Sequence, residues 1–102
     1  MKTFEVRFLA EAIDDLDALY SYIAKQSSFE IADGYLARIE RLCFSLQSFP
    51  QRGTAVAGDV AGLRTMGFER RATILFRVGE ERVEILRILY GGRDIGPQLE
   101  RL

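Results

Sequence analysis

Residues 71–90 read RATILFRVGEERVEILRILY, two strand-like runs on either side of a short polar break. The first eight residues alternate apolar and other side chains, which is the two-residue period of a β-strand. The next four include one glycine, and the last eight are rich in valine, isoleucine and leucine. This stretch predicts a β-hairpin in which Val78 faces Val83 and Arg77 faces Glu84.

Two amphipathic segments precede the hairpin. From residue 11 to about residue 25, apolar side chains recur at three- and four-residue spacing, and acidic residues occupy the first turns. Ser27 and Glu30 form a capping-box pattern that opens a second helix. That helix is expected to end near Phe49, because Pro50 disfavours the helical conformation in the residue before it.

The remaining segments complete the expected fold. Residues 3–9 alternate like a strand, residues 50–62 are a glycine-containing loop, and residues 63–66 form a short strand followed by a turn at residues 67–68. The predicted order is β-α-α-β-β-β, an α+β fold in which an antiparallel sheet packs on an N-terminal helical hairpin. We expect a single domain over residues 1–102.

Composition excludes several chemistries. Fourteen basic and fifteen acidic residues give a net charge of −1, so no global field attracts nucleic acid or an anionic membrane. Histidine is absent, and the single cysteine, Cys43, lies on the apolar stripe of the second helix, where we expect it to be core. Histidine-dependent nucleophilic catalysis and the usual zinc sites are therefore excluded, and we expect neither metal nor cofactor. With no signal-like or membrane-length apolar run, a cytoplasmic protein is expected.

Arg87 interrupts an otherwise apolar strand. The hairpin register places it beside Ile74 on the face that the helices cover, where an unpaired guanidinium would be costly. We therefore expect a carboxylate partner, namely Asp15 in the first helix, and a structural ion pair.

The same register leaves an apolar patch on the opposite face of the sheet. The side chains expected there are Leu75, Leu86, Ile88 and Tyr90. Monomers rarely leave such a patch bare, and only residues 95–102 remain to cover it. We therefore expect a protein partner on this face.

Several short patterns follow one another along almost the whole chain. They are Ala12, Asp15, Leu16, Tyr22 and Ile23; Ala32 and Tyr35; Pro50 and Gly53; Gly62, Leu63 and Arg64; Ile74, Phe76, Arg77 and Val78; Val83, Ile85, Leu86, Arg87, Ile88 and Leu89; and Tyr90, Gly91, Gly92, Arg93 and Asp94. Together with the order of elements, they resemble the ParE branch of the ParE/RelE toxin superfamily from bacterial toxin–antitoxin modules.

The resemblance implies a function and partners. ParE toxins, of the plasmid-stabilisation type, poison DNA gyrase without enzymatic activity, whereas the RelE branch cleaves messenger RNA in the ribosomal A site. A cognate antitoxin neutralises the toxin, and a ParD-like ribbon-helix-helix protein is expected here. Leu75, Leu86 and Ile88 are then the expected antitoxin-binding residues. A homodimer or a hetero-assembly with the antitoxin is also consistent with this family.

The nuclease residues of the RelE branch are largely missing. Alignment with that branch places Thr73 at its catalytic arginine, Leu99 at its tyrosine, and Arg64 and Met66 at two lysines. Only Arg93 matches a phosphate-binding arginine. Metal-free RNA cleavage requires cations and a titratable base, which threonine and leucine do not supply, so the gyrase-binding interpretation is favoured.

One alternative remains open, which is a rearranged basic site for messenger RNA cleavage. In it Arg70, Arg71, Arg77 and Tyr90 would meet on the outward face, with Tyr90 stacking on a base. The candidate target-binding residues are therefore Arg93, Tyr90, Arg64, Arg71 and Arg77. Simpler roles exist for some of these positions: Arg77 can form an exposed ion pair, and the glycines before Arg93 can permit a sharp strand exit. A decayed module member that only binds its antitoxin is a third possibility.

Overall fold

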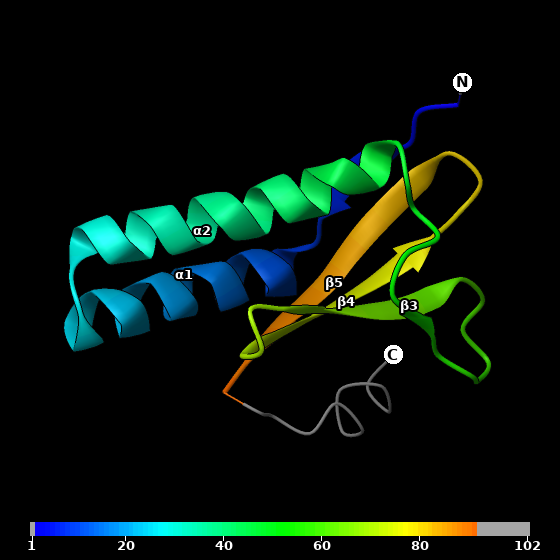
Figure 1. Cartoon of the computed structure of the whole chain (residues 1–102). Coiled ribbons are helices and arrows are strands. Elements are labelled where there is room, and N and C mark those ends of the chain that lie inside the picture. Colours follow the sequence, from blue (N-terminus) through cyan, green and yellow to red (C-terminus); the bar gives the residue numbers. More distant parts are fainter. Residues whose placement is uncertain (1, 92–102) are drawn as a thin grey trace.

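The computed structural model describes residues 2–91 (Figure 1). The elements in chain order are β1 (Glu5–Phe8), α1 (Ala10–Gln26), α2 (Phe29–Phe44), a 3₁₀ turn η1 (Ser45–Gln47), β2 (Thr54–Ala55), β3 (Leu63–Phe68), β4 (Ala72–Val78) and β5 (Arg82–Tyr90). The predicted α+β class and order of elements are confirmed. The short strand β2 lies inside the segment that was expected to be loop.

The five strands form one sheet in the order β1-β5-β4-β3-β2. Strands β3, β4 and β5 pair antiparallel in succession, as predicted, and the unpredicted β2 pairs antiparallel with β3. The prediction that the whole sheet is antiparallel is wrong in one strand. Strand β1 pairs parallel with β5, so the sheet is mixed. Parallel pairing requires a long crossover connection, which the helical hairpin and the β-meander supply here. Both helices lie on one side of this sheet (Figure 1).

The two helices begin and end slightly differently from the prediction. The side chain of Ser28 caps α2 by accepting a hydrogen bond from Ile31 N at 3.1 Å, so the predicted cap at Ser27 is wrong by one residue. Ser27 is instead the C-cap residue of α1, and its N–H donates a hydrogen bond to Ile23 O. Helix α2 ends at Phe44, where the chain tightens into η1, rather than near residue 49.

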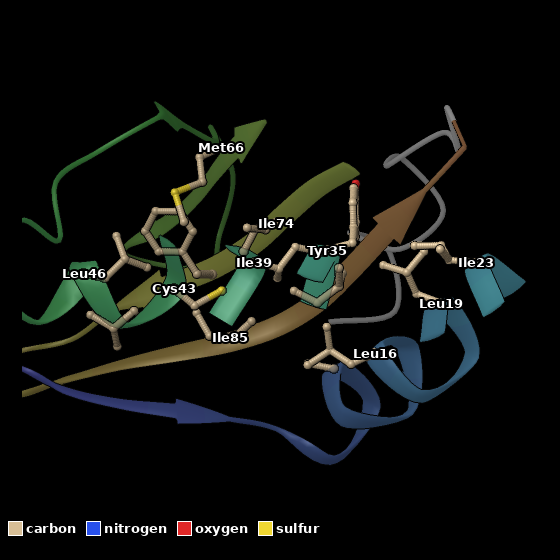
Figure 2. Close-up of a cluster of buried hydrophobic side chains, with 14 of the residues drawn as sticks. Leu16, Leu19, Ile23, Tyr35, Ile39, Cys43, Leu46, Met66, Ile74 and Ile85 are labelled. Carbon is tan, nitrogen blue, oxygen red and sulfur yellow. The ribbon is translucent and has the colours of Figure 1, made fainter. Parts of the chain in front are cut away.

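The main core lies between the helices and the inner face of the sheet. Its side chains come from both helices and from β3, β4 and β5 (Figure 2). Cys43 is fully buried in it, as predicted, and burial raises the pKa of its thiol to about 12. The thiol therefore stays protonated and packs as a small apolar group.

The hairpin of β4 and β5 contains a β-bulge. The predicted pairs Val78–Val83 and Arg77–Glu84 are present. Beyond them the register shifts, because Ile85 pairs with Phe76 whereas Arg87 pairs with Leu75, which leaves Leu86 as an extra residue.

The bulge reverses the faces expected for the end of β5. Ile88 pairs with Ile74 and belongs to the main core, and Tyr90 pairs with Ala72 and packs against that core. Alternation then puts Leu89 on the other face. The prediction that Ile88 and Tyr90 face outward is wrong, since regular alternation cannot anticipate an inserted residue.

The outer face is covered by the chain itself. Leu63, Leu75 and Leu86 form a second cluster, against which Leu9, Val56 and Val60 pack. The predicted bare patch is therefore wrong: Leu75, Leu86 and Ile88 are only 0%, 6% and 3% exposed. The loop reaches this face because β2 pairs with β3 and because Val56 N donates to Leu63 O at 2.9 Å.

The β3–β4 turn consists of residues 69–71 and begins two residues later than predicted. Two of its residues, Glu69 and Arg70, have an unusual backbone conformation. Both have positive φ, 47° and 64°, a conformation that costs non-glycine residues energy. Gly67 lies within β3 and pairs with Thr73, so the glycine was a misleading turn signal. In residues 2–91, no helix has the length and apolar character needed to cross a bilayer.

Candidate functional site

A pocket of about 500 Å³ lies between α1 and the end of β5. The residues that line it are Asp15, Ala18, Leu19, Tyr22, Arg71, Ile88, Tyr90 and Gly91. Two of the predicted target-binding residues, Arg71 and Tyr90, thus meet there. Arg93 lies outside the described residues.

Three tyrosine rings pack together next to this pocket, and two of them, Tyr22 and Tyr90, line it. The Tyr90 ring lies 5.9 Å from the Tyr22 ring and 6.0 Å from the Tyr35 ring, measured between centroids. Tyr22 is 52% exposed, whereas Tyr35 is buried and also packs edge-on against Phe68. Tyr22 and Tyr90 therefore supply the accessible aromatic surface, and the buried Tyr35 packs edge-on against Tyr90.

The Tyr35 hydroxyl is buried and has no hydrogen-bond partner among residues 2–91. Burial raises the pKa of Tyr35 to about 12, with a smaller contribution from nearby Tyr90. The phenol is thus neutral at physiological pH. It is not a general base.

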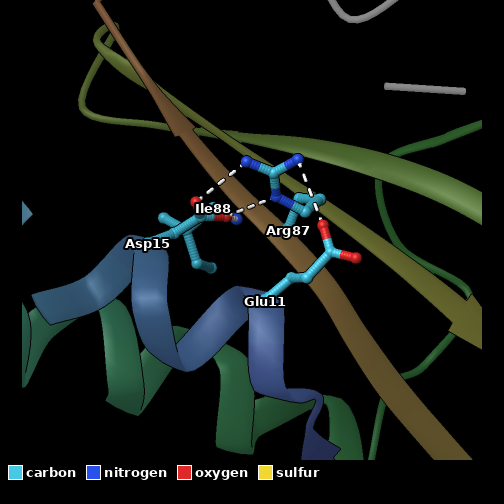
Figure 3. Close-up of polar contacts among 4 residues, drawn as sticks. All are labelled: Glu11, Asp15, Arg87 and Ile88. Carbon is cyan, nitrogen blue, oxygen red and sulfur yellow. Dashed lines mark hydrogen bonds and ion pairs between the residues drawn. The ribbon is translucent and has the colours of Figure 1, made fainter. Parts of the chain in front are cut away.

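Asp15, which lines the pocket, anchors β5 to α1 (Figure 3). Its carboxylate accepts hydrogen bonds from Arg87 Nε at 2.7 Å and Arg87 Nη2 at 2.9 Å, so the ion pair predicted from the sequence is present. The predicted position of Arg87 beside Ile74 is wrong, because the bulge places Arg87 opposite Leu75. Glu11 lies 3.6 Å from Arg87 Nη1. Both Asp15 and Arg87 are only 13% exposed, and the hydrogen bond to Asp15 raises the pKa of Arg87 further.

The same carboxylate also accepts a hydrogen bond from the backbone N–H of Ile88 at 2.9 Å. This third contact was not anticipated. It joins a side chain of α1 to the backbone of β5 directly after the bulge, where the pocket begins.

Arg71 supplies a cation to the lining of the pocket. Its side chain is exposed, and within residues 2–91 its guanidinium has no carboxylate partner. Its backbone carbonyl accepts a hydrogen bond from Gly91 N at 3.0 Å, which ties the start of β4 to the end of β5. The guanidinium is therefore available to an external anionic or polar group.

The turn before Arg71 is attached to helix α2. Arg38 Nε and Nη2 donate to the two carboxylate oxygens of Glu69 at 2.6 and 3.0 Å, a bidentate pair that lowers the pKa of Glu69. The Arg38 guanidinium also lies over the Tyr35 ring, 5.5 Å from its centroid. Helix α2 thus holds the turn that presents Arg70 and Arg71.

The other predicted target-binding arginines have local partners. Arg64 donates to Arg52 O at 2.8 Å, and its remaining contacts are to Gln51 and Gly53, so it holds the segment before β2. Arg77 pairs with Glu84, with Nε 3.0 Å from Oε1.

The basic cluster needed for the messenger RNA alternative does not form. Arg71 and Arg77 lie at opposite ends of β4, and Tyr90 faces the helices rather than the outer side of the sheet. The prediction that Arg70, Arg71, Arg77 and Tyr90 meet on one face is therefore wrong. At the position of the nuclease arginine, Thr73 is flanked by Gly67 and Leu89 on the neighbouring strands.

Sequence reasoning did not single out Tyr22 as a site residue. A signal was present, because Tyr22 is a large aromatic residue that lies beside the buried stripe of α1 rather than on it. Its proximity to Tyr90 depends on the bulge and could not be read from the chain.

Comparison with known proteins places this geometry in a family. Residues 6–95 match the family model described as "ParE toxin of type II toxin-antitoxin system, parDE". Toxin ParE3 of Caulobacter vibrioides is 33% identical over 85 residues, which are 83% of this chain and 84% of that protein.

Two solved structures are similar to the fold. The chromosomal ParDE toxin–antitoxin system of P. aeruginosa superposes with a TM-score of 0.74 at 28% identity, covering 87% of this chain and 97% of the other. The toxin–antitoxin complex RelBE2 of Mycobacterium tuberculosis gives a TM-score of 0.66 at 25% identity, covering 91% and 97%. The chain belongs to the ParE toxin family and is the toxin of a type II, ParDE-like toxin–antitoxin system.

Proposed function

We propose that this toxin acts by binding DNA gyrase and inhibiting it, and that the pocket between α1 and the end of β5 is part of the gyrase-contacting surface. The observation that carries the proposal is the combination of two aromatic side chains, Tyr22 and Tyr90, with the exposed cation of Arg71 around one pocket. Aromatic and arginine side chains are the groups that most often dominate protein–protein binding energy.

The chemistry of the pocket supports recognition rather than bond cleavage. Its carboxylate, Asp15, is bound to Arg87, and Tyr35 beneath the pocket has a pKa of about 12. The Asp15 oxygens are thus occupied by Arg87 and by the Ile88 N–H, and the Tyr35 phenol is protonated at neutral pH. Arg93 remains a proposed further contact, because it follows the strand that ends at the pocket.

A supercoiling assay with purified gyrase tests this proposal. The full chain should inhibit supercoiling and increase the amount of cleaved DNA bound to gyrase. Tyr22→Ala and Arg71→Ala should each raise the concentration for half inhibition about tenfold, as expected for loss of a central interface contact. Arg82→Ala is the matched control, because Arg82 is exposed at the other end of β5 and should leave inhibition unchanged.

Primer extension on ribosome-bound messenger RNA tests the other branch of the superfamily in parallel. No toxin-dependent cut is expected at concentrations that inhibit gyrase. Cleavage of the message together with unaffected supercoiling would overturn the gyrase proposal in favour of a ribosome-dependent endoribonuclease.

We also propose that a ParD-like antitoxin with a ribbon-helix-helix domain neutralises the toxin. Support comes from the family and from the two structural relatives, which are both named as toxin–antitoxin systems. The cytoplasm, where gyrase acts, is the proposed location.

A further inference from the structure

The pocket between α1 and the end of β5 is lined mainly by apolar and aromatic side chains. Ala18, Leu19 and Ile88 are apolar, and Tyr22 and Tyr90 add two rings whose centroids are 5.9 Å apart. A volume of about 500 Å³ lies within the range of pockets that enclose a small molecule, so there is room for one large side chain of a partner. Because tyrosine rings pack favourably against the faces and edges of other rings, an aromatic side chain suits this lining best.

The charges at the pocket are not balanced. Among residues 2–91, the charged side chains that line it are Asp15 and Arg71. The Asp15 carboxylate is compensated, because it accepts hydrogen bonds from Arg87 Nε and Nη2 and from Ile88 N. The cation of Arg71 has no carboxylate partner in the same part of the chain. The lining therefore favours a ligand that carries a negative charge.

The backbone of Arg71 is fixed at both of its polar groups. Its N–H donates to Phe68 O at 3.2 Å, and its carbonyl accepts a hydrogen bond from Gly91 N at 3.0 Å. Glu69, the acidic residue closest to Arg71 in the chain, is held by a bidentate pair with Arg38. The Arg71 guanidinium thus extends from a fixed point beside the pocket and is available for a bidentate contact with an external carboxylate.

We propose that this pocket recognises one feature of the gyrase surface, namely an aromatic side chain with an aspartate or glutamate carboxylate close to it. The ring enters the pocket beside Tyr22 and Tyr90, and the carboxylate pairs with Arg71. A basic neighbour does not fit, because Arg71 would repel it and the Asp15 carboxylate is already bound to Arg87. That gyrase supplies this feature rests on the proposed function, whereas the ligand preference of the pocket does not.

Four small molecules test the preference with the full-length toxin. Phenylpropionate carries both a ring and a carboxylate. Phenylpropylamine keeps the ring and reverses the charge, propionate lacks the ring, and cyclohexylpropionate replaces it with a saturated ring. Each is titrated at constant ionic strength, because salt screens exposed charges. NMR shifts of the Tyr22 and Tyr90 ring protons and of the Arg71 Nε–H report binding.

Phenylpropionate should bind most tightly, with a dissociation constant in the millimolar range that is usual for so small a ligand. Phenylpropylamine and propionate should each bind at least about fivefold more weakly, because one is repelled by Arg71 and the other leaves the apolar lining unfilled. Cyclohexylpropionate should bind about threefold more weakly, since it lacks the ring–ring contacts with Tyr22 and Tyr90.

Two variants assign the charge preference to Arg71. In Arg71→Gln, phenylpropionate and phenylpropylamine should bind within about twofold of each other. Arg71→Lys keeps the cation and should keep the preference for the carboxylate. Arg82→Gln removes an exposed arginine at the other end of β5 and should keep it as well. A preference that survives in Arg71→Gln would contradict the role given to Arg71.

Other results would overturn the ligand preference itself. Equal or tighter binding of phenylpropylamine would remove the carboxylate from the proposal. Equal or tighter binding of cyclohexylpropionate would remove the aromatic ring. Absence of shifts at Tyr22, Tyr90 and Arg71 with every probe at about 50 mM would show that the pocket does not take a side chain of this kind.

Competition in the supercoiling assay tests whether gyrase uses the pocket. At about three times its dissociation constant, phenylpropionate should raise the toxin concentration for half inhibition about fourfold, because it occupies about three quarters of the toxin. Propionate at the same concentration is the control for added salt and should have no effect.

The outcomes separate this inference from the proposed function. If the toxin inhibits gyrase and phenylpropionate binds without competing, gyrase contacts another surface, and the gyrase part of the inference is wrong. If the toxin does not inhibit gyrase at all, the proposed function is wrong, while the ligand preference measured by NMR stands.

Discussion

Asp15 and Arg87 are single side chains on which the packing of α1 against β5 depends. The carboxylate accepts hydrogen bonds from Arg87 Nε and Nη2 and from Ile88 N, and both side chains of the pair are largely withdrawn from water. Removal of one member of such a pair costs more than the net stabilisation by the pair, because the other charge remains buried.

Asp15→Ala should therefore lower the free energy of unfolding by about 3 kcal/mol, the lower end of the range for breaking a buried ion pair. Denaturation in urea measures the change. Glu5→Ala is the control. The pair of Glu5 with Arg7 is exposed, so it should make no measurable contribution to the free energy of unfolding. A loss of less than about 1 kcal/mol for Asp15→Ala would show that the pair is not structural.

Tyr35 gives a prediction about pH. Its pKa is raised from about 10 to about 12 by burial, so the folded state holds the phenolic proton more tightly than the unfolded state does. A raised pKa contributes stability that is fully present below pH 10 and is lost as the pH rises from 10 to 12. The free energy of unfolding should therefore fall across this window, and ultraviolet absorbance should show one tyrosine ionising only near pH 12.

Tyr35→Phe is the matching variant. It removes a hydroxyl that has no hydrogen-bond partner among residues 2–91, so stability at pH 7 should stay the same or rise by up to about 1 kcal/mol. In this variant, the part of the fall in the free energy of unfolding between pH 10 and 12 that Tyr35 causes should disappear. A marked destabilisation at pH 7 would indicate that the hydroxyl is hydrogen-bonded after all.

Among the elements, the β3–β4 turn is locally strained and is held by α2. Glu69 and Arg70 both have positive φ, a conformation that normally calls for glycine or asparagine. The bidentate pair between Arg38 and Glu69 attaches the turn to the helix. This attachment keeps Arg71 next to the pocket despite the unfavourable turn residues.

Arg70→Gly should raise the free energy of unfolding by about 1 kcal/mol, because glycine adopts positive φ without steric cost. Thermal denaturation measures the gain. Glu81→Gly in the β4–β5 turn is the control, since Glu81 does not have positive φ and should gain nothing. Equal gains in both turns would contradict the explanation from backbone strain.

For the entire chain, the central expectation is toxicity that an antitoxin reverses. Expression of the intact toxin should stop growth, and co-expression with a small adjacent-gene product containing a ribbon-helix-helix domain should restore it. Plating with inducible copies of both genes measures the effect, and Arg71→Ala should be less toxic than Arg82→Ala. Unhindered growth with a folded, abundant toxin would contradict the proposed function.

The site could be predicted from the sequence only in part. Arg71 and Tyr90 were candidates because they flank an arginine-rich hairpin, and the pocket brings them together. Arg64 and Arg77 were candidates for the same reason, yet each has a local partner that the composition of the segment does not reveal. Tyr22 was missed because its neighbour Tyr90 is 68 positions away in the chain.

Local patterns in the chain were sufficient to predict the helices, the β4–β5 hairpin, the burial of Cys43 and the pairing of Asp15 with Arg87. Each follows from short-range periodicity or from the cost of burying an unpaired charge, both of which can be read from residue types. The parallel β1, the covering of the outer face by Val56 and Val60, and the bulge that turns Tyr90 inward required the folded molecule. These features arise from contacts between segments that are distant in the chain or from an inserted residue, and short-range periodicity records neither.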